Sequence, residues 1–85
     1  MSGIPRYRQI AGNVESEIGD GVWEPGNAAP SKTVLMQRFG VAGETALRAQ
    51  GLLRERGFLV TVPGVGMLAT TPDRWPAGQA RQGEA

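Results

Sequence analysis

The acidic side chains are the first candidates for catalytic chemistry, because paired carboxylates can transfer protons or hold a metal ion. Glu15 with Glu17, and Glu44 with Glu55, lie in segments whose apolar residues recur at helical spacing. The 85 residues include no His and no Cys, which removes the commonest general base and metal ligand as well as thiolate sites and disulfides. We therefore interpret these carboxylates as solvated helix faces and expect no enzymatic activity, no metal site and no cofactor.

Basic side chains are the second candidates, because Lys and Arg bind the phosphates of nucleic acids. Those at positions that suit phosphate contact are Arg8, Lys32, Arg38, Arg48 and either Arg54 or Arg56. Nine basic and eight acidic residues give a formal net charge of only +1, well below the balance typical of strongly basic nucleic-acid-binding domains. Composition alone neither indicates nor excludes binding to nucleic acid, so the elements that position these side chains decide the question.

Three helices are predicted from the spacing of apolar residues and from capping residues. The first runs from about Pro5 to Ile18, and Trp23 after it is interpreted as packing against this helix. Ser31 is a suitable N-cap for a second helix, which ends at Gly40.

The third helix spans about Gly43 to Arg56, and Gly57 follows at a position that suits a left-handed C-terminal residue. Residues 58–62 and 67–70 are predicted to pair as a β-hairpin, joined by the turn residues 63–66. This order of elements predicts an α+β fold class: a winged helix-turn-helix with three helices and a C-terminal β-hairpin, the wing.

One domain is expected over residues 4–70, because an 85-residue chain has no room for a second core. Residues 71–85 are rich in Pro, Gly, Gln and charge and contain one large apolar residue, which predicts a flexible C-terminal tail. No apolar run approaches the roughly 20 residues needed to cross a bilayer, and residues 1–11 lack the features of a signal peptide. We therefore expect a cytoplasmic protein.

Short matches to a known pattern follow one another between residues 7 and 69. They comprise Tyr7 to Ala11, Pro25-Gly26, Pro30-Ser31, Leu35-Met36, Phe39 to Val41, Thr45, Arg48-Ala49, Leu53 to Gly57, and Pro63 to Gly66. In this order they resemble the DNA-binding domain of the GntR-type bacterial transcription regulators. The resemblance implies a sequence-specific regulator that puts its third helix in the major groove and its hairpin near the minor groove, as a homodimer on a palindromic operator. The sequence after Thr70 does not resemble the effector domain of this family.

The resemblance also implies which residues meet double-stranded DNA. They are Lys32 and Thr33 at the start of the second helix, Gly43, Glu44, Thr45, Leu47 and Arg48 on the third helix, and Gly64 and Gly66 in the hairpin turn. The family often has Ser at the position of Ala42, Arg at that of Gly43, and a polar or basic residue at that of Leu47. Gln50 stands where an apolar residue is usual, so it must find hydrogen bonds inside the domain or cost roughly 1 to 3 kcal/mol.

Two interpretations of the outer side of the third helix stay open at this point. Leu47 and Leu52 are both expected there, and Leu47 either contacts a thymine methyl group or belongs to a protein interface. Glu44 would repel phosphate unless it accepts a hydrogen bond from a cytosine amino group. The alternative to a DNA-binding regulator is a winged-helix protein-protein interaction module that has lost DNA binding and binds a protein partner through Leu47, Leu52 and the valine-rich hairpin.

Overall fold

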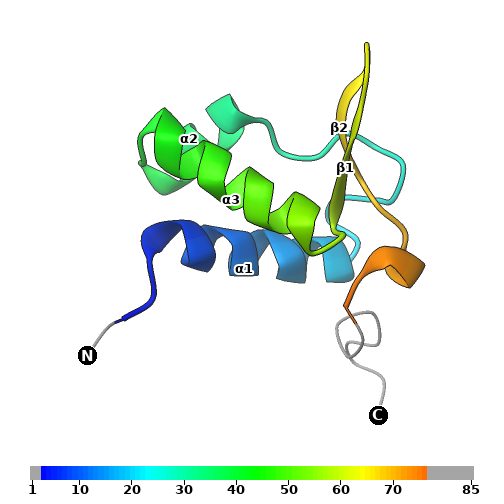
Figure 1. The fold of residues 1–85 in the computed structure, drawn as a ribbon, viewed down its shortest axis with the longest axis horizontal. Coiled ribbons are helices and arrows are strands. Elements are labelled where there is room, and N and C mark those ends of the chain that lie inside the picture. The colour runs from blue at the N-terminus through cyan, green and yellow to red at the C-terminus, as the bar shows by residue number, and fades with distance from the viewer. Residues whose placement is uncertain (1–2, 77–85) are drawn as a thin grey trace.

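The computed structural model describes residues 3–76, and its elements follow one another in the predicted order (Figure 1). They are α1 (Arg6–Gly19), α2 (Lys32–Phe39), α3 (Gly43–Glu55), β1 (Leu59–Val62), β2 (Gly66–Ala69) and a short 3-10 helix, η1 (Pro72–Arg74). The ends of the three α-helices and of both strands agree with the predicted ends to within one residue, and the winged helix-turn-helix is confirmed. Across residues 3–76, no helix combines the length and the apolar character needed to cross a membrane.

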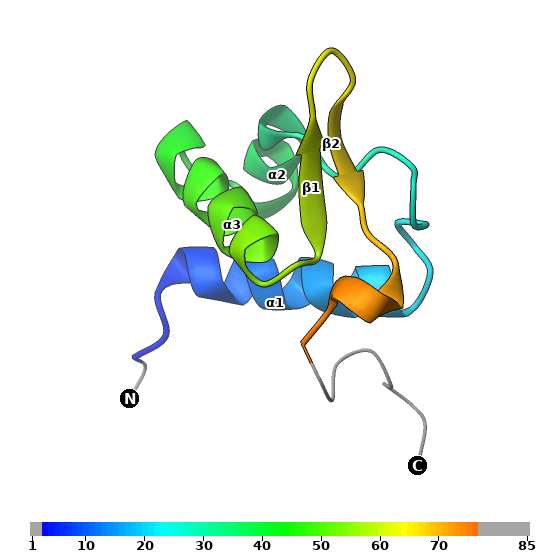
Figure 2. The same cartoon turned by 45° about the vertical axis from the view of Figure 1, so that its right-hand side comes forward.

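The hydrophobic core lies between α1 and α3, which lie side by side in both ribbon views (Figures 1 and 2). The core residues of the two helices recur at helical spacing and are at most 2% exposed: Ile10, Val14 and Ile18 of α1, and Ala46, Ala49 and Leu53 of α3. The two alanines allow the helices to approach closely, while each large side chain contributes about 1.5 to 3 kcal/mol on burial. One side of α3 is therefore buried in the core, and the opposite side faces outward.

Capping residues fix where α2 begins and ends. Ser31 Oγ accepts a hydrogen bond from the Val34 backbone N–H at 3.2 Å, as predicted for an N-cap. α2 ends at Gly40, whose φ of 64° lies in the left-handed region that glycine adopts without strain. Ala42 stands at the N-cap of α3 and provides no side-chain acceptor. The two helices are therefore joined by a short, sharply turned connection.

The hairpin projects beyond the helices, with its turn at the far end from α1 (Figure 2). β1 and β2 pair antiparallel, with Leu59 opposite Ala69. The other edge of β2 is covered by the loop before α2: the Ala29 N–H donates to the Met67 carbonyl at 3.0 Å, and the Ala69 N–H donates to the Asn27 carbonyl at 3.0 Å. This pairing fastens the α1–α2 loop to the hairpin, and local sequence patterns did not predict it.

Residues 71–76 pack on the domain and extend it beyond the predicted boundary at residue 70. The Trp75 ring stacks on the Phe58 ring with centroids 5.4 Å apart, and Trp75 Nε1 donates to Thr70 Oγ1 at 3.1 Å. Because Phe58 belongs to the core, the one large apolar residue of the predicted tail finds an apolar surface there. The prediction of a tail from Thr71 therefore does not hold for residues 71–76, and its remainder, 77–85, lies outside the described residues.

Candidate nucleic-acid interface

The first turns of α2 and α3 lie next to each other and form one surface. Lys32 and Thr33 open α2, and both are exposed. A Cβ atom added at Gly43, the first residue of α3, would lie 3.6 Å from Met36 Sδ and 3.7 Å from Lys32 Cδ. The Lys32 side chain therefore runs alongside the start of α3, and the structure brings together two of the three groups of residues that we predicted to meet DNA.

The outward face of α3 carries Glu44, Leu47 and Arg48. All three are exposed, and Leu47 is 53% exposed although it is a large apolar residue. Thr45 is half-buried on the flank of this face. Within residues 3–76, neither Glu44 nor Arg48 takes part in an ion pair. One acidic, one apolar and one basic side chain are therefore presented to solvent within little more than one turn of helix.

The hairpin turn carries the third group, Gly64 and Gly66, and stands apart from α3 in both ribbon views (Figures 1 and 2). Both glycines have positive φ, 79° and 120°, and a Cβ atom at either would meet nothing within 4 Å. Glycine is therefore required here for the conformation of the turn rather than for space. Val65 between them is 67% exposed, so the turn presents an apolar tip and backbone groups.

Gln50 and Leu52 of α3 both face the inside of the domain. Gln50 is 7% exposed, and its Nε2 donates a hydrogen bond to the Pro30 carbonyl at 3.0 Å. The hydrogen bond that its burial demands is present and fastens α3 to the segment before α2. Leu52 is half-buried and packs on the core, so the expectation that it lies on the outer side is wrong. Leu52 lies about one turn after Ala49 and adds to the buried face of α3. Leu47 therefore has no apolar neighbour at Leu52 on the outward face.

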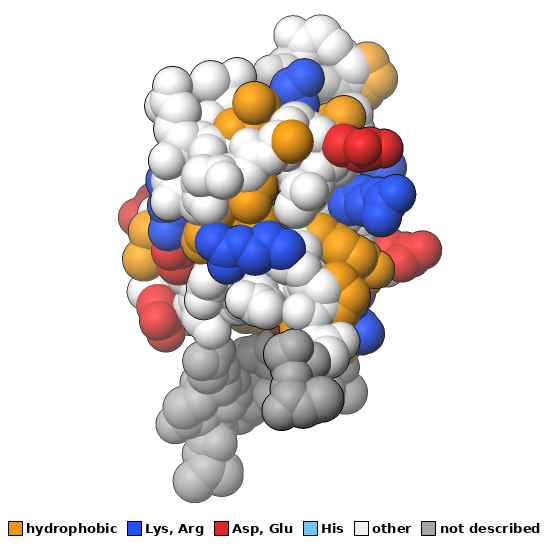
Figure 3. All heavy atoms as spheres, turned by 90° about the vertical axis from the view of Figure 1, so that its left-hand side faces the viewer, with side chains coloured by type: hydrophobic (Ala, Val, Ile, Leu, Met, Phe, Trp, Pro, Cys, Tyr) orange, Lys and Arg blue, Asp and Glu red, His pale blue; other side chains and the backbone are white. Residues whose placement is uncertain are grey.

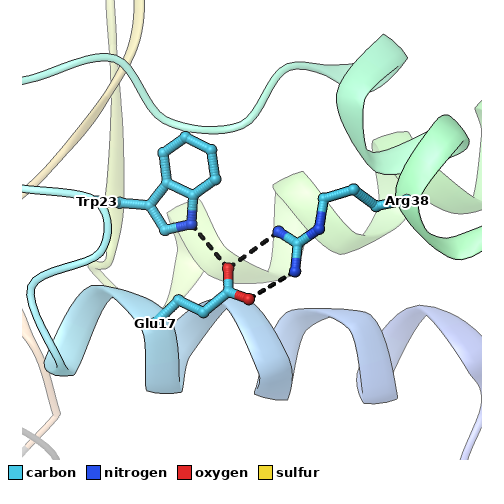
Figure 4. A network of polar contacts seen from close by, with 3 residues as sticks. All are labelled: Glu17, Trp23 and Arg38. Atoms are coloured by element: carbon cyan, nitrogen blue, oxygen red, sulfur yellow. Dashed lines mark hydrogen bonds and ion pairs between the residues drawn. The ribbon is translucent and has the colours of Figure 1, made fainter.

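A cluster of three polar side chains holds α1, α2 and the loop between them together (Figure 4). Glu17 of α1 accepts hydrogen bonds from the two terminal nitrogens of Arg38 at 3.0 and 2.6 Å, and one from Trp23 Nε1 at 2.7 Å. The Arg38 guanidinium also lies 5.0 Å from the centre of the Phe39 ring. Arg38 is thus engaged within the domain, which removes it from the expected phosphate ligands. Trp23 packs against the core, as we predicted.

A second ion pair joins α1 to the end of α3. Arg56 Nη1 lies 3.1 Å from Glu15 Oε2, and the Glu15 side chain is only 8% exposed. Burial raises the pKa of Glu15, while the charge of Arg56 opposes this rise. The interpretation of Glu15 and Glu17 as solvated helix faces is therefore wrong, because each has a basic partner that lies far along the chain. Glu44 and Glu55 are exposed, as expected.

Replacing Glu17 with glutamine is expected to destabilise the domain at neutral pH by about 1 kcal/mol. Hydrogen bonds from Arg38, and to a lesser extent from Trp23, lower the pKa of Glu17 from its ordinary value of 4.5. The charged carboxylate therefore stabilises the folded state above pH 4.5, and this contribution is lost as the pH falls through the lowered folded-state pKa. Urea unfolding of the wild type and of Glu17→Gln should differ most near neutral pH and converge in acid.

Arg38→Gln is the matched control for this prediction. Since Glu17 and Arg38 form one pair, either single change should cost a similar free energy, and the double variant should cost less than the sum of the two. Additive losses, or a difference between the wild type and Glu17→Gln that does not vary with pH, would contradict the coupling between α1 and α2.

The end of the molecule at which α3 begins has a mixed surface (Figure 3). Basic, acidic and hydrophobic side chains are interspersed with uncharged surface in this view, without a single block of positive charge. Since Arg38 and Arg56 are paired within the domain, the exposed basic residues without an ion pair in residues 3–76 include Arg8, Lys32, Arg48 and Arg54. Any anionic partner must therefore be bound by a few separate charges.

Two curated proteins that are similar to this chain in sequence are much longer than it. No protein-family model matches the sequence. The histidine utilization repressor of Klebsiella aerogenes is 34% identical over 68 residues, which cover 80% of this chain and 28% of the repressor. The mannosyl-D-glycerate transport/metabolism system repressor MngR of Escherichia coli (strain K12) is 37% identical over 66 residues, which cover 78% of this chain and 28% of that protein. The chain thus spans little more than a quarter of these relatives.

Solved structures match the described fold over most of the chain. A GntR family transcriptional regulator from Listeria monocytogenes has a TM-score of 0.72 and 31% identity, covering 82% of this chain and 61% of that chain. A crystal structure of AraR(DBD) in complex with operator ORX1 has a TM-score of 0.73 and 33% identity, covering 82% of this chain and 87% of that chain. In the second case the structural match extends over most of the compared chain.

Proposed function

Because the chain belongs to the GntR-type winged helix-turn-helix DNA-binding domains, we propose that it binds double-stranded DNA sequence-specifically, as the DNA-binding part of a bacterial transcription regulator. Two relatives are repressors by name, and AraR(DBD) was crystallised with operator DNA. The observation that carries the proposal is the surface formed by the first turns of α2 and α3, where Lys32, Glu44, Leu47 and Arg48 are all exposed. Such a regulator acts in the cytoplasm.

In the proposed complex α3 enters the major groove with its first turns, because α1 covers the opposite side of this helix (Figure 1). Gly43, Glu44, Thr45, Leu47 and Arg48 then face the base edges or the nearby backbone. Lys32 and Thr33 contact phosphate and fix the register of α3. Gly64 and Gly66 allow the backbone of the hairpin turn to approach the edge of the minor groove.

Electrostatics give this interface a modest affinity. If Arg8, Lys32, Arg48 and Arg54 each contact one phosphate, about four counterions are released per protomer. The logarithm of the binding constant should then fall with the logarithm of the salt concentration with a slope of roughly −3.6. A single protomer with so few contacts binds weakly at physiological salt, and we therefore propose that two copies bind a palindromic operator as a homodimer.

The alternative function, a protein-interaction module, needs a continuous apolar surface on α3. That surface was predicted to include Leu52, which instead packs on the core. Leu47 then stands alone on the outward face, next to charged residues. The DNA-binding function is accordingly the one we propose.

Selection of DNA by the purified protein tests this proposal. The 85-residue chain is mixed with genomic fragments and with random duplexes, and the retained DNA is sequenced at 50 and 200 mM salt. We expect one enriched palindrome and a steep loss of binding between the two salt concentrations. If the protein is folded by circular dichroism and retains no DNA above background even at 50 mM salt, the proposed function is wrong.

A further inference from the structure

The first two turns of α3 offer an unusual pair of side chains to a ligand. Glu44 and Leu47 are three residues apart, so they lie on the same face of the helix. Both are exposed, and Glu44 forms no ion pair within residues 3–76. Gly43 before them has no side chain to contribute. On this face, the first two turns of α3 therefore offer one hydrogen-bond acceptor, Glu44, and one apolar group, Leu47.

Leu47 has the size and setting for contact with a single methyl group. It is 53% exposed, and the other large exposed apolar side chains of residues 3–76 lie on different elements: Ile4, Val22 and Val65. A lone leucine does not make the contiguous apolar patch that protein docking requires. In the major groove, by contrast, the 5-methyl group of thymine is an isolated apolar feature that one aliphatic side chain can cover.

Glu44 complements this contact because an ionised carboxylate only accepts hydrogen bonds. Guanine presents two acceptors in the major groove, N7 and O6, and would repel it. Cytosine presents the 4-amino group, a donor, as its polar feature there. Adenine presents its 6-amino donor beside the N7 acceptor, which an ionised carboxylate cannot satisfy. Glu44 at the start of α3 therefore favours cytosine and disfavours guanine at the base pair that it faces.

The remaining polar side chains of this face do not change that preference. Thr45 is half-buried. Arg48 lines a surface hollow of about 470 Å³ between α1 and α3, together with Tyr7, Leu52, Arg54 and Glu55, which places it at the flank of the interface. The two arginines outnumber the single carboxylate, so the hollow has a net positive charge that suits a phosphate better than a base edge.

We propose that α3 recognises pyrimidines: Leu47 packs on a thymine methyl group, and Glu44 accepts a hydrogen bond from a cytosine amino group in the same half-site. This inference rests on the proposed function, since it requires α3 to lie in the major groove. It assigns the base preference of the domain to Leu47 and Glu44.

Single replacement of each thymine by deoxyuridine in the enriched duplex tests the contact of Leu47, because only the methyl group is removed. Measured by fluorescence anisotropy, the wild type should lose about fourfold in affinity at one thymine per half-site and stay unchanged at the others. Leu47→Ala should bind the thymine and uracil duplexes equally. Val22→Ala, a matched loss of an exposed apolar side chain on the α1–α2 loop, should keep the fourfold difference.

Glu44→Gln tests the second contact by a change of preference rather than a loss of binding. Glutamine forms paired hydrogen bonds with adenine, so the base selected at that position should change from cytosine to adenine in a repeated selection. Loss of the negative charge should at the same time raise binding to unrelated DNA, because a repulsion from phosphate disappears.

The outcomes separate this inference from the proposed function. A wild type that binds an enriched duplex with a steep salt slope but tolerates uracil at every position overturns the role of Leu47 and leaves DNA binding intact. An unchanged preference in Glu44→Gln overturns the role of Glu44 in the same way. A folded wild type that retains no DNA at low salt overturns both the inference and the function on which it rests.

Discussion

Replacing Gly57 with valine is expected to lower the free energy of unfolding by more than about 3 kcal/mol, a large share of the roughly 5 to 10 kcal/mol that holds a domain of this size. Gly57 ends α3 with a φ of 88°, which a β-branched residue adopts only under strain. A Cβ atom there would also lie 2.0 Å from the carbonyl oxygen of Arg74. Urea unfolding followed by circular dichroism measures the loss.

The collision has a structural consequence that tryptophan fluorescence detects. To make room for a side chain at Gly57, the segment around Arg74 must move away, and Trp75 must then leave its place against Phe58. We therefore expect the emission of Gly57→Val to shift to the red even where helical content remains. In a Trp75→Phe background the emission reports Trp23 alone, which separates release of the segment from unfolding of the whole domain.

Two other glycines provide matched controls. Gly40 also has positive φ, 64°, but a Cβ atom there meets nothing within 4 Å, so Gly40→Ala should cost only about 1 kcal/mol. Gly51 lies within α3 with free space around it, and Gly51→Ala should stabilise the domain by roughly 0.5 to 1 kcal/mol. Gly57→Ala should lower the free energy of unfolding more than Gly40→Ala does. Equal losses from the two variants would contradict the close approach of Arg74 to Gly57.

Local signals predicted most of the fold, because helices and hairpins depend on residues that are near one another in the sequence. Ser31 caps α2, Gly40 ends it, and Gly57 ends α3, each as its residue type indicates. The apolar residues that recur at helical spacing in α1 and α3 are buried, whereas Leu52 and Glu15 were expected to face outward and do not. The outward position of Leu47 was expected because relatives usually have a polar or basic residue there, and its exposure agrees with this expectation.

Contacts between distant segments were not predicted, since periodicity assigns a residue to a face but not to a partner. Arg38 and Glu17 are 21 residues apart, and their pairing depends on how α2 is placed relative to α1 in the folded domain. The docking of Trp75 on Phe58 likewise depends on an apolar surface that exists only after the hairpin has folded. In the proposed interface, the short link between α2 and α3 explains why Lys32 lies beside Gly43. The roles of these two residues in DNA binding stay predictions.

Replacing Gly43 with arginine is expected to raise the affinity for mixed-sequence DNA about eightfold at 0.1 M salt, by adding one phosphate contact. Gly43 is the first residue of α3, and a Cβ atom there would make only ordinary contacts with Met36 and Lys32, so the longer side chain fits. A positive charge at a helix N-terminus costs a few tenths of a kcal/mol, which is smaller than this gain. In anisotropy titrations between 50 and 200 mM salt, the slope should become steeper by about 0.9.

Asn13→Arg is the matched control for Gly43→Arg, because it adds the same charge at an exposed position. Asn13 lies in α1 and is turned away from Arg8 around the helix, outside the proposed interface, so this variant should change the salt slope little. An equal gain from both variants would indicate attraction by net charge alone, without an oriented complex. No gain from Gly43→Arg, in a protein that binds DNA, would mean that the start of α3 does not approach the phosphates, and the orientation proposed for α3 would have to be abandoned.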